Sequence, residues 1–359
     1  MSFVLLLSPA FLWAQVDPVF VNALPSILDE ASGIECVHPD TCWTHNDNND
    51  GARIYLIDGG GVFLGQRTLS EASQVDYEDI CKDNDGNIYV GDFGNNDNER
   101  QDLVIYRSSP SAEAGSLVDA DRIEFTLEDQ ASFPPPANNR NFDIEGMVHH
   151  GGFLYLFTRN RTIPFNGVCK MYRLPSDPGT YVASLTGSFF GNFSEIYSSI
   201  TAAAISPSGG RLALLTNGSL YLFADLTDGP DISGSSTYNF FTFTPAFEGI
   251  SFVDECLTYL VTEADNSGPA SLYSLNTCDI LTSLTEECIE PPLTYSNGRL
   301  AFRDELLGSI TLFDTSGRIL FQSGSGSDFD LPGFLPSGIY VAMYALEDVS
   351  GTMRFHHER

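Results

Sequence analysis

Five polar residues, each followed two positions later by an apolar residue, recur along this chain of 359 residues. They stand in the segments EASGIECV, YEDICKD, IEGMVHH, ITAAAIS and FEGISFV, and they are Ser32, Glu78, Glu145, Thr201 and Glu248. Three are carboxylates, which repel one another and take up protons when they are brought together without a cation. Oxygen ligands without Cys or His favour a hard ion, and Ca²⁺ accepts an irregular set of them more readily than Mg²⁺ does. The pattern therefore predicts a site with Ca²⁺ as cofactor.

The alternative is that each carboxylate caps a backbone turn or pairs locally, in which case no ion is needed. In the calcium hypothesis, Ser32 and Thr201 complete the ring through a hydroxyl, a backbone carbonyl or a water molecule. The two hypotheses differ in whether the fold brings the three carboxylates together.

A second set of polar residues follows the next apolar run of each unit, in the loops 44–47, 92–96, 158–161, 216–217 and 262–265. If the first two strands of each unit are antiparallel, these loops surround the five anchor residues and form a binding or catalytic rim. The ligand-binding candidates on or beside these loops are His45, Asn46, Arg53, Asp92, Asn95, Arg100, Arg159, Asn160 and Asn217. Asp47 and Glu263 are the candidates that orient or deprotonate a water molecule. Ordinary turn chemistry is the competing explanation for these residue types.

The elements that must position these residues are strands in a repeated order. The anchors are separated by 46, 67, 56 and 47 residues, and an apolar–Tyr pair follows each of them by some 20 to 28 residues. Such periods suit propeller blades, and the runs are short, rich in β-branched and aromatic residues, and bounded by turn residues. The last unit lacks a fourth strand, which the N-terminal DPVFVNALP can supply. We expect an all-β fold, with residues 15–288 forming a five-bladed β-propeller closed by this N-terminal strand. A pair of β-sandwiches is the alternative, which the five-fold phase disfavours.

The composition narrows the classes of partner and reaction. Seventeen basic residues against 48 acidic ones give a net charge of −31, so nucleic acid and anionic membranes are repelled. No GxSxG, P-loop, HExxH or dinucleotide motif occurs, which disfavours serine hydrolase and cofactor-dependent redox chemistry.

The EF-hand-like segment 46–51 lacks a Glu at the twelfth position, which is Ile57, and is predicted to be a turn. The pairs 149–150 and 356–357, both HisHis, are predicted to be structural.

The N-terminus and the cysteines favour export. Residues 1–14 are apolar, too short to span a bilayer, and end as a cleaved signal peptide does; no second segment predicts a transmembrane anchor. The seven cysteines leave at least one thiol free. We expect Cys36 and Cys42 to form a disulfide across a turn, a second disulfide to come from Cys256, Cys278 and Cys288, and Cys81 and Cys169 to lie in the core.

After a linker at 289–295, residues 296–359 have the pattern of a small separate β-sandwich. The stretches ITLFDTSGRILF and LPSGIYVAMY resemble the C-terminal sorting domain of proteins exported by the type IX secretion system of Bacteroidota. The resemblance implies an Ig-like sandwich, a secreted or cell-surface location and the type IX machinery as a partner. The segment departs from the family in reading YSNG instead of a YPNP-like start and in ending HHER instead of a Lys-rich strand.

The order Ser, Glu, Glu, hydroxyl, Glu resembles that of calcium-dependent apyrases, and so do the words YEDICKDNDGNIYVGD and FEGISFV. The resemblance covers roughly residues 28–275 and implies a five-bladed fold with a central Ca²⁺ at the start of the inner strands. The run also resembles a broad set of secreted bacterial propellers with WTHND, GDxGxN, ISPSG and EG words. The chain departs from apyrases in its few basic residues, which cannot be matched to that family's phosphate-binding set.

Two functions fit these observations best. The first is an exported calcium-binding propeller that binds an extracellular ligand, such as a glycan or a cell-surface partner, at the central-channel face; the acidic surface and the Asn, Asp and Thr of the loops favour it. The alternative is a calcium-dependent hydrolase of phosphoesters or nucleotides, in which Arg53, Arg100, Arg159 or Arg161 offsets developing charge. In a third arrangement the ion is purely structural and the partner binds to the sides of the blades.

Overall fold

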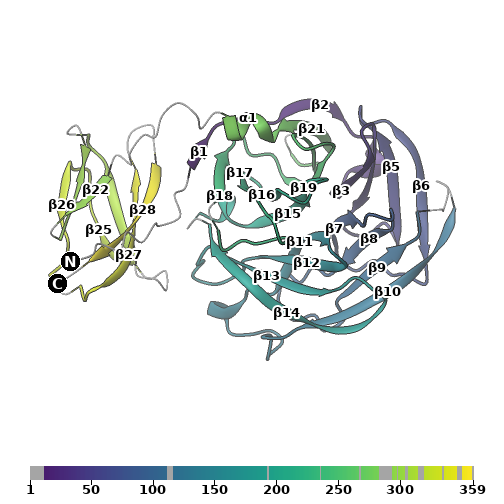
Figure 1. The fold of residues 1–359 in the computed structure, drawn as a ribbon, viewed down its shortest axis with the longest axis horizontal. Helices are drawn as coiled ribbons and strands as arrows, with labels where there is room; N and C mark the ends of the chain where they lie inside the picture. The colour runs from purple at the N-terminus through teal and green to yellow at the C-terminus, as the bar shows by residue number, and fades with distance from the viewer. Residues whose placement is uncertain are drawn as a thin grey trace. The chain divides into compact units, whose positions relative to one another are not determined.

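The computed structural model describes residues 12–110, 116–191, 194–234, 236–266, 268–282, 293–296, 298–303, 306–313, 319–333, 335–345 and 350–357. These residues form two compact units, one within 12–282 and one within 293–357, and each is built mainly of strands (Figure 1). Within the described ranges, no helix is long and apolar enough to cross a membrane.

The described strands of the larger unit fall mainly into antiparallel groups of four. The first is β3 (Ala31–His38), β4 (Thr41–Asn46), β5 (Arg53–Asp58) and β6 (Phe63–Ser70). The second is β7 (Tyr77–Lys82), β8 (Ile88–Asp92), β9 (Val104–Ser108) and β10 (Leu117–Leu127). The third is β11 (Asp143–His150), β12 (Phe153–Arg159), β13 (Val168–Pro175) and β14 (Gly179–Phe190). The fourth is β15 (Ile200–Ile205), β16 (Leu212–Thr216), β17 (Ser219–Phe223) and β18 (Ser236–Phe240). The fifth is β19 (Phe247–Phe252), β20 (Leu257–Thr262), β21 (Ser271–Asn276) and β2 (Val19–Ala23).

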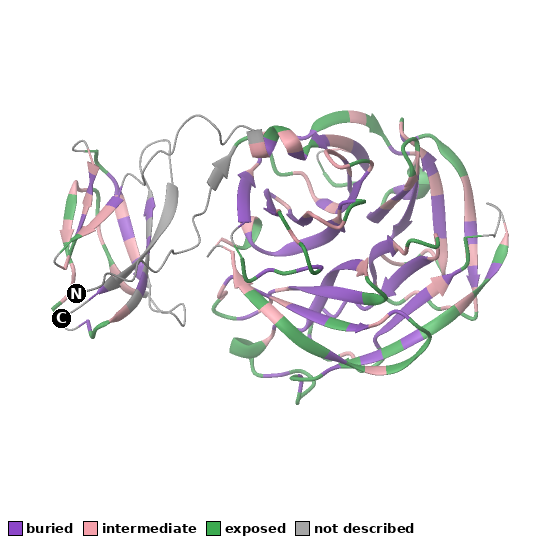
Figure 2. Ribbon diagram, viewed as in Figure 1, coloured by how far each residue is buried: buried purple, intermediate pink, exposed green. Residues whose placement is uncertain are grey.

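The first strands of these groups contact one another in cyclic order, β3 with β7, β7 with β11, β11 with β15, β15 with β19, and β19 with β3. They are buried on both faces because apolar clusters fill the space between successive groups. Figure 2 shows the contrast between these buried inner strands and outer strands such as β10 and β14, in which exposed residues are frequent. This arrangement is propeller-like.

The repeated apolar–Tyr pairs form the third strand of each group. Tyr55, Tyr106, Tyr172 and Tyr221 are each at most 1% exposed, which explains why aromatic residues recur at this place. The fifth, Tyr273, is partly buried because β2 lies beside it, with Phe20 opposite Tyr273 in an antiparallel register. The N-terminal segment therefore supplies the fourth strand of the last group, as the sequence pattern predicts.

Two pairings were not anticipated from the sequence. The strand β1 (Leu12–Ala14), within the segment interpreted as a leader, pairs in parallel with β18. The outer strand β10 pairs in parallel with both β6 and β14, so three neighbouring groups join into a 12-stranded sheet. These contacts cover edges of outer strands that would otherwise expose unpaired backbone groups.

Short helices and disulfides complete the larger unit. The helices are η1 (Ser26–Leu28), η2 (Ala137–Asn139), η3 (Glu195–Tyr197) and α1 (Thr277–Thr282). Disulfides join Cys36 to Cys42 and Cys256 to Cys278, and the thiols of Cys81 and Cys169 are free and buried. The predicted Cys36–Cys42 bridge and the two core thiols are confirmed, while the third candidate for the second bridge, residue 288, lies outside the described residues.

The smaller unit contains two antiparallel sheets that share one apolar core. One sheet consists of β22 (Leu293–Ser296), β23 (Arg299–Phe302) and β26 (Asp328–Asp330). The other consists of β24 (Ser309–Phe313), β25 (Ile319–Gln322), β27 (Gly338–Ala345) and β28 (Ser350–His357). Tyr340, in the LPSGIY segment, is buried and donates a hydrogen bond of 2.7 Å to the Pro336 carbonyl. Residues 314–318, within the stretch ITLFDTSGRILF, lie outside the described residues.

Candidate metal centre

Each of the five anchor residues lies where the register of a first strand shifts, as it does at a β-bulge. The strand register shifts between Ala31 and Ile34, Tyr77 and Asp79, Ile144 and Gly146, Ile200 and Ala202, and Phe247 and Gly249. A bulge removes a residue from the regular ladder and re-aims its side chain, and bulges are frequent beside functional sites. The same local device therefore occurs in all five groups at the positions that the sequence pattern selects.

The polar loops begin beside these bulges. Asp92 stands opposite Tyr77, Thr158 opposite Ile144, and Thr262 opposite Phe247. Because first and second strands are antiparallel, the end of each second strand meets the bulge of the first strand. The structure thus brings the predicted rim loops and the anchors to one end of their strands.

Carboxylates form a continuous chain at this end of the strands. Three overlapping triplets have carboxylate oxygens within 4.8 Å of one another, and they are Glu30–Asp47–Glu263, Asp47–Asp76–Glu78 and Glu78–Asp143–Glu145. Asp47 and Glu78 each belong to two triplets and link them. We call these seven residues the acidic chain.

Three members of the acidic chain, Glu30, Asp76 and Asp143, were not selected from the sequence. Each stands two positions before an anchor, in EAS, DYE and DIE. Residues two apart along an extended segment point to the same side, so this spacing is a signal that the sequence offers. At the corresponding place before Thr201 stands Ser199, and the hydroxyl oxygens of both are buried without a hydrogen-bond partner among the described residues.

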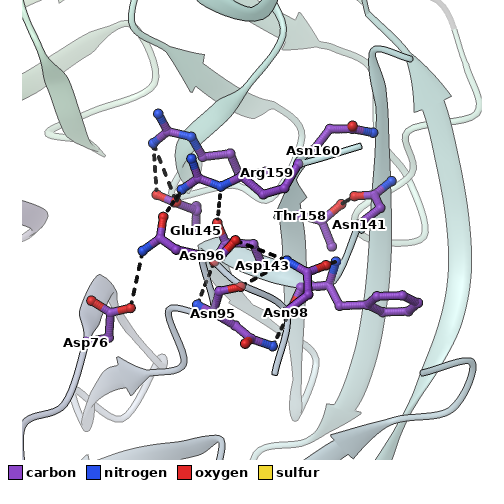
Figure 3. A network of polar contacts seen from close by, with 12 residues as sticks. Asp76, Asn95, Asn96, Asn98, Asn141, Asp143, Glu145, Thr158, Arg159 and Asn160 are labelled. Atoms are coloured by element: carbon purple, nitrogen blue, oxygen red, sulfur yellow. Dashed lines mark hydrogen bonds and ion pairs between the residues drawn. The ribbon is translucent and has the colours of Figure 1, made fainter. Parts of the chain in front are cut away.

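Two arginines neutralise one end of the acidic chain (Figure 3). The Nη1 atom of Arg159 lies 3.4 Å from Glu145 Oε1 and 4.0 Å from Glu248 Oε2. Arg161 pairs with Asp143 at 2.6 Å and with Glu145 at 3.1 Å. Glu145 and Glu248 are thus bound to guanidinium groups, an arrangement that the simple five-anchor ring does not include. The local-pairing alternative describes this end of the chain.

Among the residues that the structure describes, no such cation pairs with the triplet in the middle of the acidic chain. Within the described residues, Asp47, Asp76 and Glu78 form no ion pair with Lys or Arg. Burial, together with Glu145 and Asp143, raises the pKa of Glu78 well above its usual range. Burial and the Asp76 carboxylate raise the pKa of Asp47 to about 7. Uncompensated carboxylates at this density require protons or an external cation.

Two further observations fit a hard cation at the triplet Asp47–Asp76–Glu78. Asp47 Oδ1 is buried and has no hydrogen-bond partner among the described residues. A Cβ atom added at Gly94 would lie 2.1 Å from Glu78 Oε1 and 2.3 Å from Asp76 Oδ2, so only glycine lets this loop approach the two carboxylates. Carboxylate oxygens with no thiol or imidazole are the donor set that Ca²⁺ prefers. The residues Asp47, Asp76 and Glu78 therefore fit the predicted cofactor better than the full ring of anchors does.

Several predicted ligand-binding residues hold the acidic chain in place. Asp92 accepts hydrogen bonds from the amides of Val75 and Asp76 and pairs with Arg100 at 3.1 Å. Arg100 also donates to the Gly94 carbonyl, at 2.9 Å.

Two amide-bearing residues position carboxylates from neighbouring loops. The Asn95 backbone N–H donates to Asp143 Oδ1 at 2.6 Å, and the Asn217 side-chain amide donates to Glu248 Oε1 at 3.3 Å. The Ser32 hydroxyl is directed to the Glu78 backbone carbonyl at 3.0 Å, so it ties β3 to β7. Asn95 and Ser32 thus hold Asp143 and Glu78 of the acidic chain, and Asn217 holds the neighbouring Glu248.

The remaining predicted residues are engaged elsewhere. His45 is fully buried, its ring packs edge-on against Tyr77, and burial lowers its pKa to about 4. The Asn46 amide donates to the Ile27 carbonyl, and Arg53 pairs with Asp50. The Asn160 amide donates within its own loop, to Asn166 and Val168. By contrast, the two predicted catalytic residues, Asp47 and Glu263, share a triplet of the acidic chain.

Comparisons with known proteins give only distant likenesses. No protein-family profile matches the chain. No curated protein matches it either. Among solved structures, the PQQ-bound aldose sugar dehydrogenase of Streptomyces coelicolor is similar with a TM-score of 0.42 and 12% identity, over 75% of this chain and 99% of that one. A gluconolactonase of Xanthomonas campestris is similar with a TM-score of 0.34 and 12% identity, over 75% of this chain and 97% of that one. Likenesses of this size carry no argument about activity.

Proposed function

We propose that this chain is a five-bladed propeller, closed by β2, whose hub holds a Ca²⁺ ion and whose adjoining face binds an extracellular ligand. The observation that carries the proposal is the acidic chain, in which three carboxylate triplets overlap at Asp47 and Glu78. The ion would be held by Asp47, Asp76 and Glu78, the middle triplet of the acidic chain, with which none of the described arginines pairs. A divalent cation there would offset the repulsion between carboxylates and supply a fixed positive charge to a ligand.

Ca²⁺ is the ion that the donor set supports best. The carboxylates come from a bulge, from loops and from strand ends, and Ca²⁺ tolerates such irregular and flexible coordination. Mg²⁺ demands a near-ideal octahedron at shorter distances. The cluster contains no Cys or His, which disfavours Zn²⁺ and other transition metals.

The extracellular assignment is supported by the disulfides, which form and persist in oxidising compartments. Residues 1–14 would be the leader, and residues 296–359 a type IX sorting domain that engages the secretion machinery. The ligand class that suits an acidic face with polar loops is a glycan or a cell-surface partner.

A calcium-dependent phosphoester hydrolase is the second candidate. It is favoured by Glu263, because burial and neighbouring carboxylates raise its pKa to about 8, close to the value that a general base or acid needs. Asp47, the other predicted catalytic residue, would be occupied as a ligand of the ion. When bound, the ion would polarise a phosphoryl oxygen. Arg159 and Arg161 would be the nearby cations, but both are already paired with carboxylates of the acidic chain.

Calorimetric titration of Ca²⁺ into chelator-treated protein tests the metal proposal. We expect one saturable site. Glu78→Gln should weaken its calcium affinity by about 100-fold, whereas Glu99→Gln, a substitution in an exposed loop, should leave the affinity unchanged. Equal effects of the two substitutions would contradict the hub assignment.

Phosphate release from a panel of nucleotides and phosphomonoesters, with Ca²⁺ and with chelator, separates the two functions. A calcium-dependent release that Asp47→Asn or Glu263→Gln abolishes would establish the hydrolase. A flat response across all substrates would leave the ligand-binding function.

A further inference from the structure

A hollow of about 510 Å³ opens beside the last strand group of the larger unit. It is bordered by strands β2, β20 and β21 and by the loop before β19. Its walls include Phe20, Phe243, Thr262, Glu263, Asp265 and Tyr273. Neither the metal proposal nor the rim candidates, apart from Glu263, use this hollow.

Three aromatic rings form one side of the hollow. The rings of Phe20 and Tyr273 meet edge to face with centroids 5.6 Å apart, and the ring of Phe243 lies 6.0 Å from that of Tyr273. Phe247, which is fully buried, lies 5.3 Å from Tyr273 and 6.2 Å from Phe243 and anchors the cluster to the core. Phe20 nevertheless remains 56% exposed and Phe243 37% exposed. The rings are therefore held in place and still accessible.

Two carboxylates also line this hollow, so its wall is negatively charged as well as aromatic. Glu263 belongs to the acidic chain and also lines the hollow, and Asp265 is a second carboxylate in its lining. Among the described residues that line it, none is Lys, Arg or His. The faces of aromatic rings carry negative charge density, so rings and carboxylates together attract a cation.

The combination selects one class of ligand. An anion would be repelled by Glu263 and Asp265. A bare metal ion would gain little from the exposed rings of Phe20 and Phe243. A neutral sugar could stack on the rings and donate hydroxyl hydrogen bonds to the carboxylates, but it would leave their negative charge uncompensated. An organic cation with methyl or methylene groups uses both features, because it buries apolar surface against the rings while its charge is met by carboxylates.

We propose that this hollow binds a small organic ammonium ion, whose alkyl groups contact Phe20, Phe243 and Tyr273 and whose charge faces Glu263. The inference goes beyond the proposed function, because it adds a second ligand class at a hollow that the metal proposal does not use. It does not require calcium to be bound.

The test uses choline and its uncharged isostere 3,3-dimethylbutan-1-ol, which has the same shape without the positive charge. Each is titrated into the full chain by calorimetry, once with Ca²⁺ and once with chelator. We expect saturable binding of choline and binding of the isostere that is about tenfold weaker. Equal affinity for the two compounds, or no saturable binding of choline, would overturn the proposal.

Substitutions locate the site. Phe243→Leu and Glu263→Gln should each weaken choline binding by about fivefold to tenfold. Phe63→Leu, which removes a ring of β6 that is 40% exposed and does not line the hollow, should leave it unchanged. Melting temperatures close to that of the unmodified chain will show that the variants fold.

The outcomes separate this inference from the metal proposal. Calcium binding without choline binding overturns the ammonium site alone, and choline binding without calcium binding overturns the metal site alone. Binding of a neutral oligosaccharide that depends on Phe243, with none of choline, would mean that the hollow is a sugar subsite and that the ammonium assignment is wrong.

Discussion

At the scale of single residues, the feature that matters most is how charge is compensated along the acidic chain. Arg159 and Arg161 reach Asp143, Glu145 and Glu248, whereas Asp47, Asp76 and Glu78 have no comparable partner among the described residues. An unpaired buried carboxylate takes up a proton or attracts a cation. This difference in charge compensation is why we assign the proposed ion to the neighbourhood of Glu78. The arginines neutralise Asp143, Glu145 and Glu248 instead.

Removing one arginine tests that difference. Arg161→Met should lower the melting temperature in chelator by more than it does in saturating Ca²⁺, because the ion bound near Glu78 can partly replace the lost positive charge beside Asp143 and Glu145. Arg122→Met, which removes an exposed arginine paired with Glu124, serves as the control. Thermal unfolding of both variants in the two buffers gives the comparison. An equal loss for Arg161→Met in both would show that the ion and the arginine do not share these carboxylates.

Gly94 provides a test that changes no charge. A methyl group there would lie 2.1 Å from Glu78 Oε1, so Gly94→Ala must displace the carboxylate or the loop. We expect calcium affinity to fall by about tenfold or more. Gly234→Ala is the control, because a Cβ atom at Gly234 meets nothing within 4 Å. Unchanged calcium affinity in Gly94→Ala would mean that Glu78 is not a ligand.

At the scale of elements, the bulges of the first strands are the device that assembles the site. They could be located from the sequence, because each interrupts a strand at a polar residue just before an apolar run, as at Glu78 and Glu248. The Cys36–Cys42 disulfide could also be predicted, because the two cysteines flank a turn. The position of β2 could be predicted because the last group lacks a fourth strand of its own.

Other features depend on contacts between distant segments and could not be predicted. Arg161 lies 16 positions after Glu145, and nothing in its local sequence says that its guanidinium turns toward that carboxylate. The parallel pairing of β10 with β6 and β14 depends on the distance and angle between neighbouring strand groups. Asp76 and Asp143 were missed although their spacing to Glu78 and Glu145 was visible, because acidic residues before a strand are also ordinary turn formers.

Asp79 links three first strands and was not anticipated. Its buried carboxylate accepts hydrogen bonds from the amides of Ile80 at 2.9 Å, Met147 at 2.7 Å and Ala203 at 3.2 Å, in β7, β11 and β15. Asp79→Ala would leave three buried donors unpaired and should lower the free energy of unfolding by about 3 kcal/mol or more. Asp119→Ala, at an exposed strand position, should change it by less than about 0.5 kcal/mol. Urea unfolding measures both, and a similar small loss for the two would contradict the linking role.

At the scale of the whole molecule, the dominant property is the net charge of −31, part of which is concentrated in the acidic chain. Concentrated carboxylates oppose folding unless protons or cations neutralise them. The fold of the larger unit and its cation content should therefore be thermodynamically coupled, since an ion that binds only the folded state stabilises it.

This coupling predicts a pH dependence of stability. Burial raises the pKa of Asp47 to about 7 and that of Glu263 to about 8. In the unfolded chain both pKa values are about 4. Between these values the folded state holds protons that the unfolded state has lost, so stability is highest at the acidic end of this window and falls as the pH rises. We expect the melting temperature in chelator to fall by several degrees from about pH 5 to about pH 8, and Ca²⁺ to reduce that fall. A slope that is the same with and without Ca²⁺ would contradict the coupling.

The most direct test of the central claim is an anomalous difference map from crystals grown in Ca²⁺ and measured at a wavelength where calcium scatters anomalously. We predict a single strong peak coordinated by carboxylate oxygens of Asp47, Asp76 and Glu78. A map without a peak among these carboxylates, or one in which they bind only protein groups, would contradict it.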